Sequence, residues 1–117
     1  MSFHSFGLPH SFIDILEKEH YKTPYPIQQA AIPVILKGRD ILGIAPTGSG
    51  KTASYVLPVL STLNRKKGAK DRQVDVLVLV PTRELAEQVK KVFLLFEKGL
   101  EYSAPTMAVY GGVSINP

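Results

Sequence analysis

A glycine-containing run at residues 45–52, lying between two apolar segments, carries the clearest chemistry in this sequence. It reads Ala-Pro-Thr-Gly-Ser-Gly-Lys-Thr. The apolar stretch at 40–44 predicts a short buried strand before the run, and residues 53–57 predict the opening of a helix after it. A strand, a glycine-containing turn and a helix, with Gly-Lys-Thr at the junction, are typical of a loop that binds a chain of phosphates.

Each residue type in this loop has a physical task. Gly48 and Gly50 allow the backbone a positive φ and bring its N–H groups close to an anion. The N–H groups and the dipole at a helix start favour negative charge there. Lys51 supplies a positive charge for the β- and γ-phosphates, and Thr52 supplies a hydroxyl for Mg²⁺, so these two carry the catalytic roles. The expected nucleotide-binding residues of the loop are Pro46, Thr47, Gly48, Ser49, Gly50, Lys51 and Thr52.

The loop departs from the general pattern at its first position, where Ala45 stands in place of glycine. The alternative interpretation is a surface turn that contains Gly-Lys-Thr by chance. The strand and helix patterns on either side favour the phosphate loop, because the motif requires that context.

Composition places the chain among globular proteins. Of its 117 residues, 44% are hydrophobic and 21% charged, which argues against disorder. No apolar run reaches the ~18 residues of a membrane span, and the N-terminus lacks the pattern of a signal peptide. Cysteine is absent, so disulfides and thiolate metal sites are excluded, and we expect a cytoplasmic location without membrane contact.

The formal net charge of +4 leans weakly toward an anionic partner. Much of the excess lies at residues 65–72, which read Arg-Lys-Lys-Gly-Ala-Lys-Asp-Arg. A solvated loop between a helix and a strand is the favoured interpretation of this stretch. An auxiliary patch that contacts a phosphate backbone is the alternative.

Helix and strand patterns alternate along the chain. Helices are predicted from Pro9 to about His20 and at about 26–36, 51–64 and 83–98, and strands at 40–45, 74–80 and 106–110. This order predicts an α/β fold with a parallel sheet flanked by helices. Ligands gather at the carboxyl ends of such strands, where the phosphate loop, residues 81–84 and the glycine pair 111–112 all fall.

Four elements in this order resemble the N-terminal part of a DEAD-box RNA helicase core. The phosphate loop is similar to motif I of that family, which commonly begins with Ala. Residues 81–86, Pro-Thr-Arg-Glu-Leu-Ala, resemble motif Ia, and the pair 111–112 resembles the GG element. Residues 20–28, His-Tyr-Lys-Thr-Pro-Tyr-Pro-Ile-Gln, resemble the Q motif. The resemblance covers essentially the whole chain and implies a RecA-like P-loop domain that binds ATP and Mg²⁺.

The Q motif is matched with two departures. His20 stands where glycine is usual and Tyr25 where threonine or serine is usual, whereas Gln28 is intact. The resemblance implies that Gln28 contacts adenine, whose N6 and N7 suit an amide donor and acceptor. It also implies that Tyr21 offers an aromatic face to the base. A plain helix residue and a packing residue are the respective alternatives.

Phe3 lies at the spacing of the upstream aromatic of the Q motif. We expect Phe3 and Phe6 to pack so that they position this loop. The three histidines, His4, His10 and His20, lack the spacing of metal ligands and are interpreted as surface or loop residues.

The resemblance further implies contacts to the sugar-phosphate backbone of RNA, without reading of base identity. Alternatives are a surface pair at Arg83 and Glu84 and a simple turn at the glycine pair. Glu87 and Lys91, four residues apart, are interpreted as a solvated helix pair. The residues expected to contact RNA are Pro81, Thr82, Arg83, Gly111 and Gly112.

The Asp-Glu-Ala-Asp segment that names the family does not occur in this sequence, and no Asp follows Asp75. We therefore expect residues 1–117 to represent part of a first RecA-like domain, truncated before the later motifs and the second domain. Such a chain should bind nucleotide with little hydrolysis and no unwinding. Its sheet should have an uncovered edge that favours self-association.

Two other functional classes remain open on the sequence. The first is another phosphate-loop enzyme, such as a small nucleotide kinase or a DNA helicase. The second is a non-enzymatic RNA-binding module. An adenine-reading Gln28 argues against a kinase, and a preference for DNA over RNA would favour a DNA helicase. Dependence of RNA binding on the basic stretch at 65–72, without dependence on Arg83, would favour the non-enzymatic module.

Overall fold

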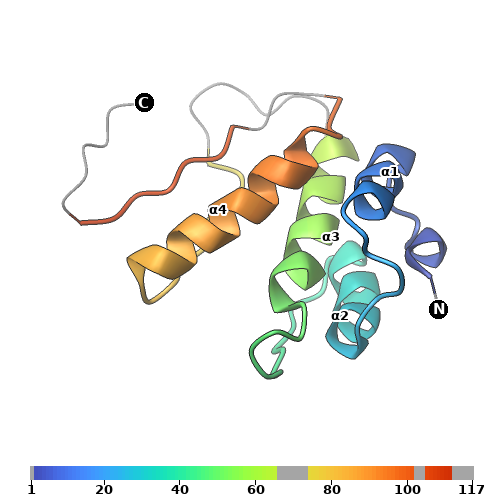
Figure 1. The fold of residues 1–117 in the computed structure, drawn as a ribbon, viewed down its shortest axis with the longest axis horizontal. Coiled ribbons are helices and arrows are strands. Elements are labelled where there is room, and N and C mark those ends of the chain that lie inside the picture. Colours follow the sequence, from blue (N-terminus) through green and yellow to red (C-terminus); the bar gives the residue numbers. More distant parts are fainter. Residues whose placement is uncertain (1, 66–73, 102–104, 112–117) are drawn as a thin grey trace.

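A computed structural model describes residues 2–65, 74–101 and 105–111, which form a group of packed helices joined by extended segments (Figure 1). The elements, in chain order, are a 3₁₀ helix, η1 (Phe3–Phe6), and the α-helices α1 (His10–Lys18), α2 (Pro26–Leu36), α3 (Lys51–Arg65) and α4 (Arg83–Glu97). The predicted helices are therefore confirmed to within one or two residues at most ends. None of the helices in these ranges is long and apolar enough to cross a membrane. The basic stretch at 66–73 lies outside the described residues, and so does Gly112.

The helix boundaries follow from local sequence. Pro26 occupies the first position of α2, where its missing N–H costs no hydrogen bond, and Gly38 follows the helix with a φ of 77°. Thr82 caps α4, because its side-chain oxygen accepts the backbone N–H of Leu85 at 3.2 Å. A cap at Thr82 and a left-handed glycine at position 38 thus set these two boundaries.

The core surrounds α3, with α4 on one side of this helix and α1 and α2 on the other (Figure 1). Phe12 of α1 and Phe96 of α4 are fully buried, and their ring centroids lie 6.3 Å apart. The Ser11 hydroxyl donates to the Gly99 carbonyl at 2.7 Å, which fastens α1 to the end of α4. A Cβ added at Gly99 would lie 2.9 Å from Cδ1 of Phe12, so this contact leaves no room for a side chain.

No strand is assigned within the described ranges, so the predicted sheet is not observed there. The three segments expected as strands instead run unpaired beside the helices. Exposure alternates along two of them, at 76–80 and 105–110, but not along 40–45: Val76, Val78 and Val80 are half-buried against the core, whereas Leu77 and Leu79 are 76% and 84% exposed. An alternation with a period of two is typical of extended backbone with one covered face. The described segments are therefore extended but lack the backbone hydrogen bonds to a neighbour that define a strand.

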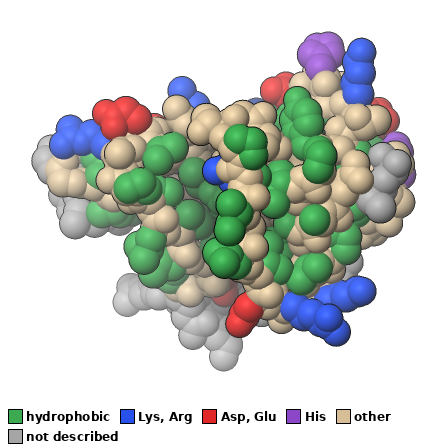
Figure 2. Space-filling model, turned by 90° about the horizontal axis from the view of Figure 1, so that it is seen from below, with side chains coloured by type: hydrophobic (Ala, Val, Ile, Leu, Met, Phe, Trp, Pro, Cys, Tyr) green, Lys and Arg blue, Asp and Glu red, His purple; other side chains and the backbone are tan. Residues whose placement is uncertain are grey.

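The opposite face of these segments is apolar and uncovered. Figure 2 shows hydrophobic side chains spread over one side of the molecule, with most charged side chains toward the rim. The exposed large hydrophobic residues of the three segments are Ile41, Leu42, Ile44, Val74, Leu77, Leu79, Met107 and Val109.

Residues 105–111 lie along α4 and run in the opposite direction (Figure 1). The Thr106 hydroxyl donates to Glu97 near the end of the helix at 3.0 Å. At the other end, the Gly111 carbonyl accepts a hydrogen bond from Arg83, the first residue of the helix, also at 3.0 Å. This arrangement brings motif Ia and the first glycine of the GG element together.

Candidate functional site

The phosphate loop has the backbone that an anion site requires. Gly48 and Gly50 have φ angles of 82° and 83°, and the Ser49 N–H donates to the Pro46 carbonyl at 3.2 Å. The helix α3 begins at Lys51, whose side chain is exposed. Free N–H groups at the start of a 15-residue helix thus meet a lysine ammonium at the same end of the loop.

Several hydroxyl groups lie in or beside this loop. The Ser49 hydroxyl is buried and has no hydrogen-bond partner in the part of the chain that the structure describes. The Ser54 hydroxyl donates to the Lys51 carbonyl. Burial raises the pKa of the Tyr55 hydroxyl, and a hydrogen bond with the Thr52 side chain opposes that rise. Thr52, expected to meet Mg²⁺, is half-buried, and its hydroxyl lies beside that of Tyr55.

Gln28 joins the Q-motif segment to the phosphate loop. Its Oε1 accepts the backbone N–H of Tyr25 at 2.9 Å, and its Nε2 donates to the Gly50 carbonyl at 3.1 Å. The side chain has no exposed surface. An amide carries two N–H donors and two acceptor lone pairs, so one of each remains for a further partner. The structure thus gives Gln28 a bridging task within the protein that the sequence did not predict.

The two tyrosines of the Q motif differ in their surroundings. The Tyr21 ring is half-buried in edge-to-face contact with Phe3 and Phe96, at 6.3 and 6.2 Å between centroids. Burial raises the pKa of Tyr21, with smaller contributions from the charges of Glu19 and Tyr25. Phe3 is buried, as expected for a packing residue that supports this segment. Tyr21 is thus itself a packing residue, with part of its ring left open.

Tyr25 is 53% exposed and lies against the phosphate loop. A Cβ added at Gly50 would lie 2.7 Å from Cδ2 of Tyr25 and 2.5 Å from Nε2 of Gln28, so both side chains crowd the same side of that glycine. Gly50 therefore needs to be glycine for two reasons, its positive φ and this close approach. Tyr25 stands where the resemblance implies a small residue, and this departure is the sequence signal for the crowding beside Gly50.

A cavity of about 260 Å³ adjoins the start of α3. Its walls are mainly apolar side chains of α2 and of residues 41–43, and Lys51 and Tyr55 close its other side. The lining residues are Ile27, Ala31, Ile35, Ile41, Gly43, Lys51, Ser54 and Tyr55.

A second group of polar residues surrounds the start of α4. The Arg83 guanidinium donates to the Gly111 carbonyl at 3.0 Å and lies 5.5 Å from the centroid of the Tyr110 ring. The Tyr110 hydroxyl donates to Oε1 of Glu87 at 2.7 Å, and this bond is the main cause of a raised pKa at Tyr110. An open hollow of about 360 Å³ lies over these side chains and is also lined by Lys91.

Four of the five residues expected to contact RNA lie at or beside this second group. Thr82 is occupied as the helix cap, Arg83 and Gly111 contact each other, and Pro81 is exposed just before the helix. Glu87, interpreted from the sequence as half of a solvated pair with Lys91, instead accepts a hydrogen bond from Tyr110. Sequence periodicity could place Glu87 on α4 but gave no signal for a partner 23 residues away.

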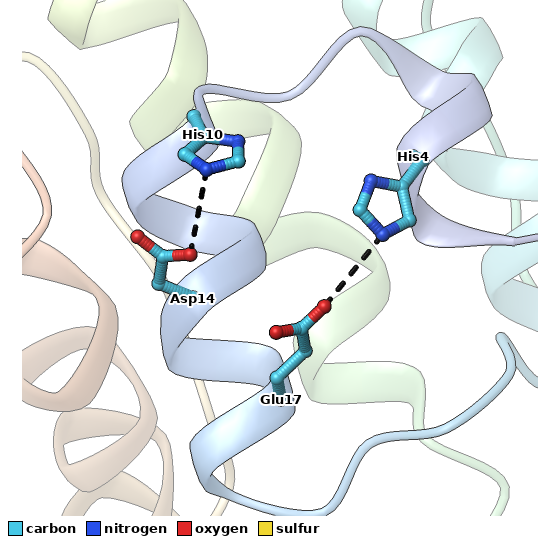
Figure 3. Close-up of polar contacts among 4 residues, drawn as sticks. All are labelled: His4, His10, Asp14 and Glu17. Atoms are coloured by element: carbon cyan, nitrogen blue, oxygen red, sulfur yellow. Dashed lines mark ion pairs between the residues drawn. The ribbon is translucent and has the colours of Figure 1, made fainter.

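The three histidines lie at the surface, as predicted. Figure 3 shows two of them, His4 and His10, each facing a carboxylate. His4 Nε2 lies 3.7 Å from an oxygen of Glu17, and His10 Nε2 lies 3.6 Å from an oxygen of Asp14. All four side chains are more than 60% exposed, so each contact is a screened ion pair when the imidazole is protonated. His20 ends the α1 segment with a φ of 64°, a left-handed conformation that glycine adopts without strain. Within the described ranges, no group of three or more metal-ligating side chains occurs.

Residues 25–117 match the family model of the DEAD/DEAH box helicases. The chain belongs to this family, and the resemblance of its motifs to DEAD-box helicases is confirmed. It is 46% identical over 112 residues to the ATP-dependent RNA helicase DeaD of Buchnera aphidicola subsp. Baizongia pistaciae, covering 96% of this chain and 18% of the relative. It is 51% identical over 96 residues to the ATP-dependent RNA helicase dbp9 of Aspergillus niger, covering 80% of this chain and 16% of the relative.

Solved structures show the same fold. The RNA helicase Prp28 from Chaetomium thermophilum, crystallised with ADP, matches with a TM-score of 0.83 and 38% identity over 97% of this chain and 27% of that one. A DEAD box protein from Methanococcus jannaschii matches with a TM-score of 0.83 and 28% identity, over 98% of this chain and 30% of that one. The RecA-like class of the fold is therefore confirmed. The chain spans less than a fifth of the length of the two curated relatives.

Proposed function

We propose that this chain is the ATP-binding part of an ATP-dependent RNA helicase, in which ATP hydrolysis is coupled to local opening of an RNA duplex. The observation that carries the proposal is the phosphate loop, in which two glycines with positive φ lead into α3 at Lys51. Family membership supports it, and so do the two RNA helicases named above. Prp28 was crystallised with ADP, which supports an adenine nucleotide as the ligand.

The residues present fit ATP and Mg²⁺. The buried Ser49 hydroxyl, which has no partner among the described residues, and the N–H groups at the start of α3 are donors suited to phosphate oxygens. Lys51 would hold the β- and γ-phosphates and the Thr52 hydroxyl would face Mg²⁺; Pro46, Thr47, Gly48 and Gly50 would complete the loop around them. When bound, ATP supplies a phosphoryl group for transfer to water.

Recognition of the base is assigned to Gln28 and Tyr21. Gln28 keeps one N–H and one lone pair for adenine while it bridges Tyr25 and Gly50. Because the Gln28 side chain has no exposed surface, a base reaches it only after a neighbour moves. Tyr25, which shares the same side of Gly50, is the neighbour best placed to do so.

RNA is assigned to the start of α4 and the GG element. Pro81, Thr82, Arg83, Gly111 and Gly112 would contact the sugar-phosphate backbone, because a guanidinium, a hydroxyl and a close backbone approach at glycine suit phosphate without reading base identity. The contact between Arg83 and Gly111 supports a shared site.

The architecture of the whole domain is proposed on the same basis. Residues 1–117 would form part of the first RecA-like domain, with 40–45, 74–80 and 106–110 as strands of a parallel sheet. The apolar face of these segments and their unpaired backbone support self-association of the chain alone. Because the Asp-Glu-Ala-Asp segment is not in the sequence, we expect the chain alone to bind nucleotide with little hydrolysis. A cytoplasmic location remains a prediction.

Calorimetric titration with Mg-ATP, Mg-ADP and Mg-GTP tests the proposal. We expect adenine nucleotides to bind more tightly than Mg-GTP, Lys51→Ala to weaken all three, and Gln28→Ala to weaken the adenine nucleotides selectively. Circular dichroism of each variant identifies loss of folding. Equal affinity for Mg-ATP and Mg-GTP would contradict the role of Gln28, and tighter binding of DNA than of RNA would favour a DNA helicase.

A further inference from the structure

We propose that Tyr110 and Glu87 are positioning residues that hold the Arg83 guanidinium in the orientation in which it binds an RNA phosphate. The inference rests on the RNA contact proposed for Arg83 and names the two side chains that fix its geometry. Both act through Arg83, and neither is required to touch RNA.

The contacts form a chain that ends at the guanidinium. The Tyr110 hydroxyl donates to Oε1 of Glu87 at 2.7 Å, which fixes the tilt of the ring against α4. The Arg83 guanidinium carbon lies 5.5 Å from the centroid of that ring, within the range of a cation–π contact. One guanidinium nitrogen of Arg83 donates to the Gly111 carbonyl at 3.0 Å, which adds a second constraint.

These constraints matter because Arg83 is exposed at the first position of α4. An exposed arginine samples many rotamers, and binding a phosphate then costs side-chain entropy. A guanidinium that is already held on an aromatic ring and a carbonyl loses less freedom when its remaining N–H donors meet a phosphate. The hollow of about 360 Å³ in front of these side chains leaves room for a phosphate and its sugar.

The charge of Glu87 would by itself repel RNA, and this makes a sharp test possible. Glutamine at position 87 removes the charge but still accepts the Tyr110 hydroxyl, whereas alanine removes both. If Glu87 acted only through its charge, the two variants would bind RNA equally well. Since the proposal assigns the hydrogen bond a positioning role, Glu87→Ala should bind more weakly than Glu87→Gln.

The measurement is fluorescence anisotropy of a short labelled oligouridylate titrated with this chain across a series of salt concentrations. We expect Glu87→Ala to bind about threefold or more weakly than Glu87→Gln, the amount that one ordinary hydrogen bond supplies. Tyr110→Phe should weaken binding by a similar factor. The salt dependence of binding should stay unchanged in Tyr110→Phe, because the guanidinium charge is retained, and become shallower in Arg83→Ala.

Glu84 provides the matched control, because it lies one position after Arg83 at the same hollow but does not bond to Tyr110. Glu84→Gln and Glu84→Ala should bind RNA equally well. Thermal unfolding of every variant separates loss of positioning from loss of folding. Tyr110→Phe and Glu87→Gln are conservative changes, so we expect both variants to fold.

The outcomes separate the two proposals. If Arg83→Ala weakens binding but the two Glu87 variants and Tyr110→Phe bind alike, the positioning role is overturned and the RNA site stands. If Arg83→Ala binds like the wild type, or the wild type does not bind the oligouridylate, the RNA site at Arg83 is overturned together with the positioning role.

Discussion

Replacing Gln28 with glutamate tests the buried amide bridge between the Q-motif segment and the phosphate loop. In the wild type, Oε1 accepts the Tyr25 N–H and Nε2 donates to the Gly50 carbonyl. Glutamate keeps the first bond but places an oxygen where the amide nitrogen stood. At neutral pH a carboxylate oxygen then faces the Gly50 carbonyl oxygen, in a side chain that has no exposed surface.

The size of the effect follows from these contacts. Loss of the donor removes one of two hydrogen bonds to the Gly50 carbonyl, which also accepts the Ser54 N–H at 3.3 Å, and one such bond contributes about 1 kcal/mol. Burial of an ionised carboxylate adds to this, so we expect the free energy of unfolding to fall by about 3 kcal/mol at neutral pH. Protonation restores a donor toward Gly50, and burial also favours the neutral form. Both effects raise the folded-state pKa of the introduced carboxyl above its ordinary value.

The sign of the pH dependence is then fixed. A carboxyl with a raised folded-state pKa contributes its stability below the ordinary glutamate value of about 4.3 and loses it as pH rises through the folded-state pKa. The deficit of Gln28→Glu relative to the wild type is therefore small near about pH 4.5 and largest at about pH 7.5. Urea unfolding followed by circular dichroism, with both proteins measured at both pH values, gives this deficit.

Gln88→Glu is the matched control, because it makes the same chemical change on an exposed side chain of α4. Its effect should stay within about 0.5 kcal/mol at both pH values. A deficit for Gln28→Glu that is equal at the two pH values, or no larger than that of Gln88→Glu, would refute the donor role of the Gln28 amide toward the phosphate loop.

Three further substitutions test packing and backbone conformation, each by urea unfolding. His20→Gly should raise the free energy of unfolding by roughly 0.5–1 kcal/mol, because His20 has a φ of 64°; a decrease would contradict the left-handed conformation. Ser61→Ala should raise it by about 1 kcal/mol, because the Ser61 hydroxyl is buried and unpartnered among the described residues; a marked loss would reveal an unseen partner. Gly99→Ala should lower it by about 1–3 kcal/mol, because the new Cβ would lie 2.9 Å from the Phe12 ring; an unchanged value would mean that α1 and α4 pack less tightly there.

Local signals predicted the helices well. The cap at Thr82, the proline at the start of α2 and the glycine after its end each depend on a few neighbouring residues, and the structure has all three. The phosphate loop was likewise predictable, since the positive φ angles of Gly48 and Gly50 are local requirements of the motif. The three predicted strands are not observed in the described ranges. A local pattern can indicate an extended segment, but a strand also needs hydrogen-bonded neighbours.

Contacts between distant residues explain what the sequence missed at the site. The Gln28 amide finds its second partner 22 residues away, and the Tyr110 hydroxyl finds Glu87 at a separation of 23. The Tyr21 ring, predicted to offer an aromatic face to the base, also packs on Phe96, 75 positions further along the chain. Residue type indicated which chemistry was available in each case, but only the packed fold decided which partner received it.

The bond between Ser11 and Gly99 has a consequence for the order in which the molecule forms during synthesis. The two residues are 88 positions apart, and the buried rings of Phe12 and Phe96 meet beside them. On the ribosome, the apolar face of α1 must therefore stay exposed until α4 has emerged, a long wait for a contact of this separation. Of the four α-helices described here, α1 is made before the others but is covered only when α4 has emerged, which leaves it open to chaperones in the interval.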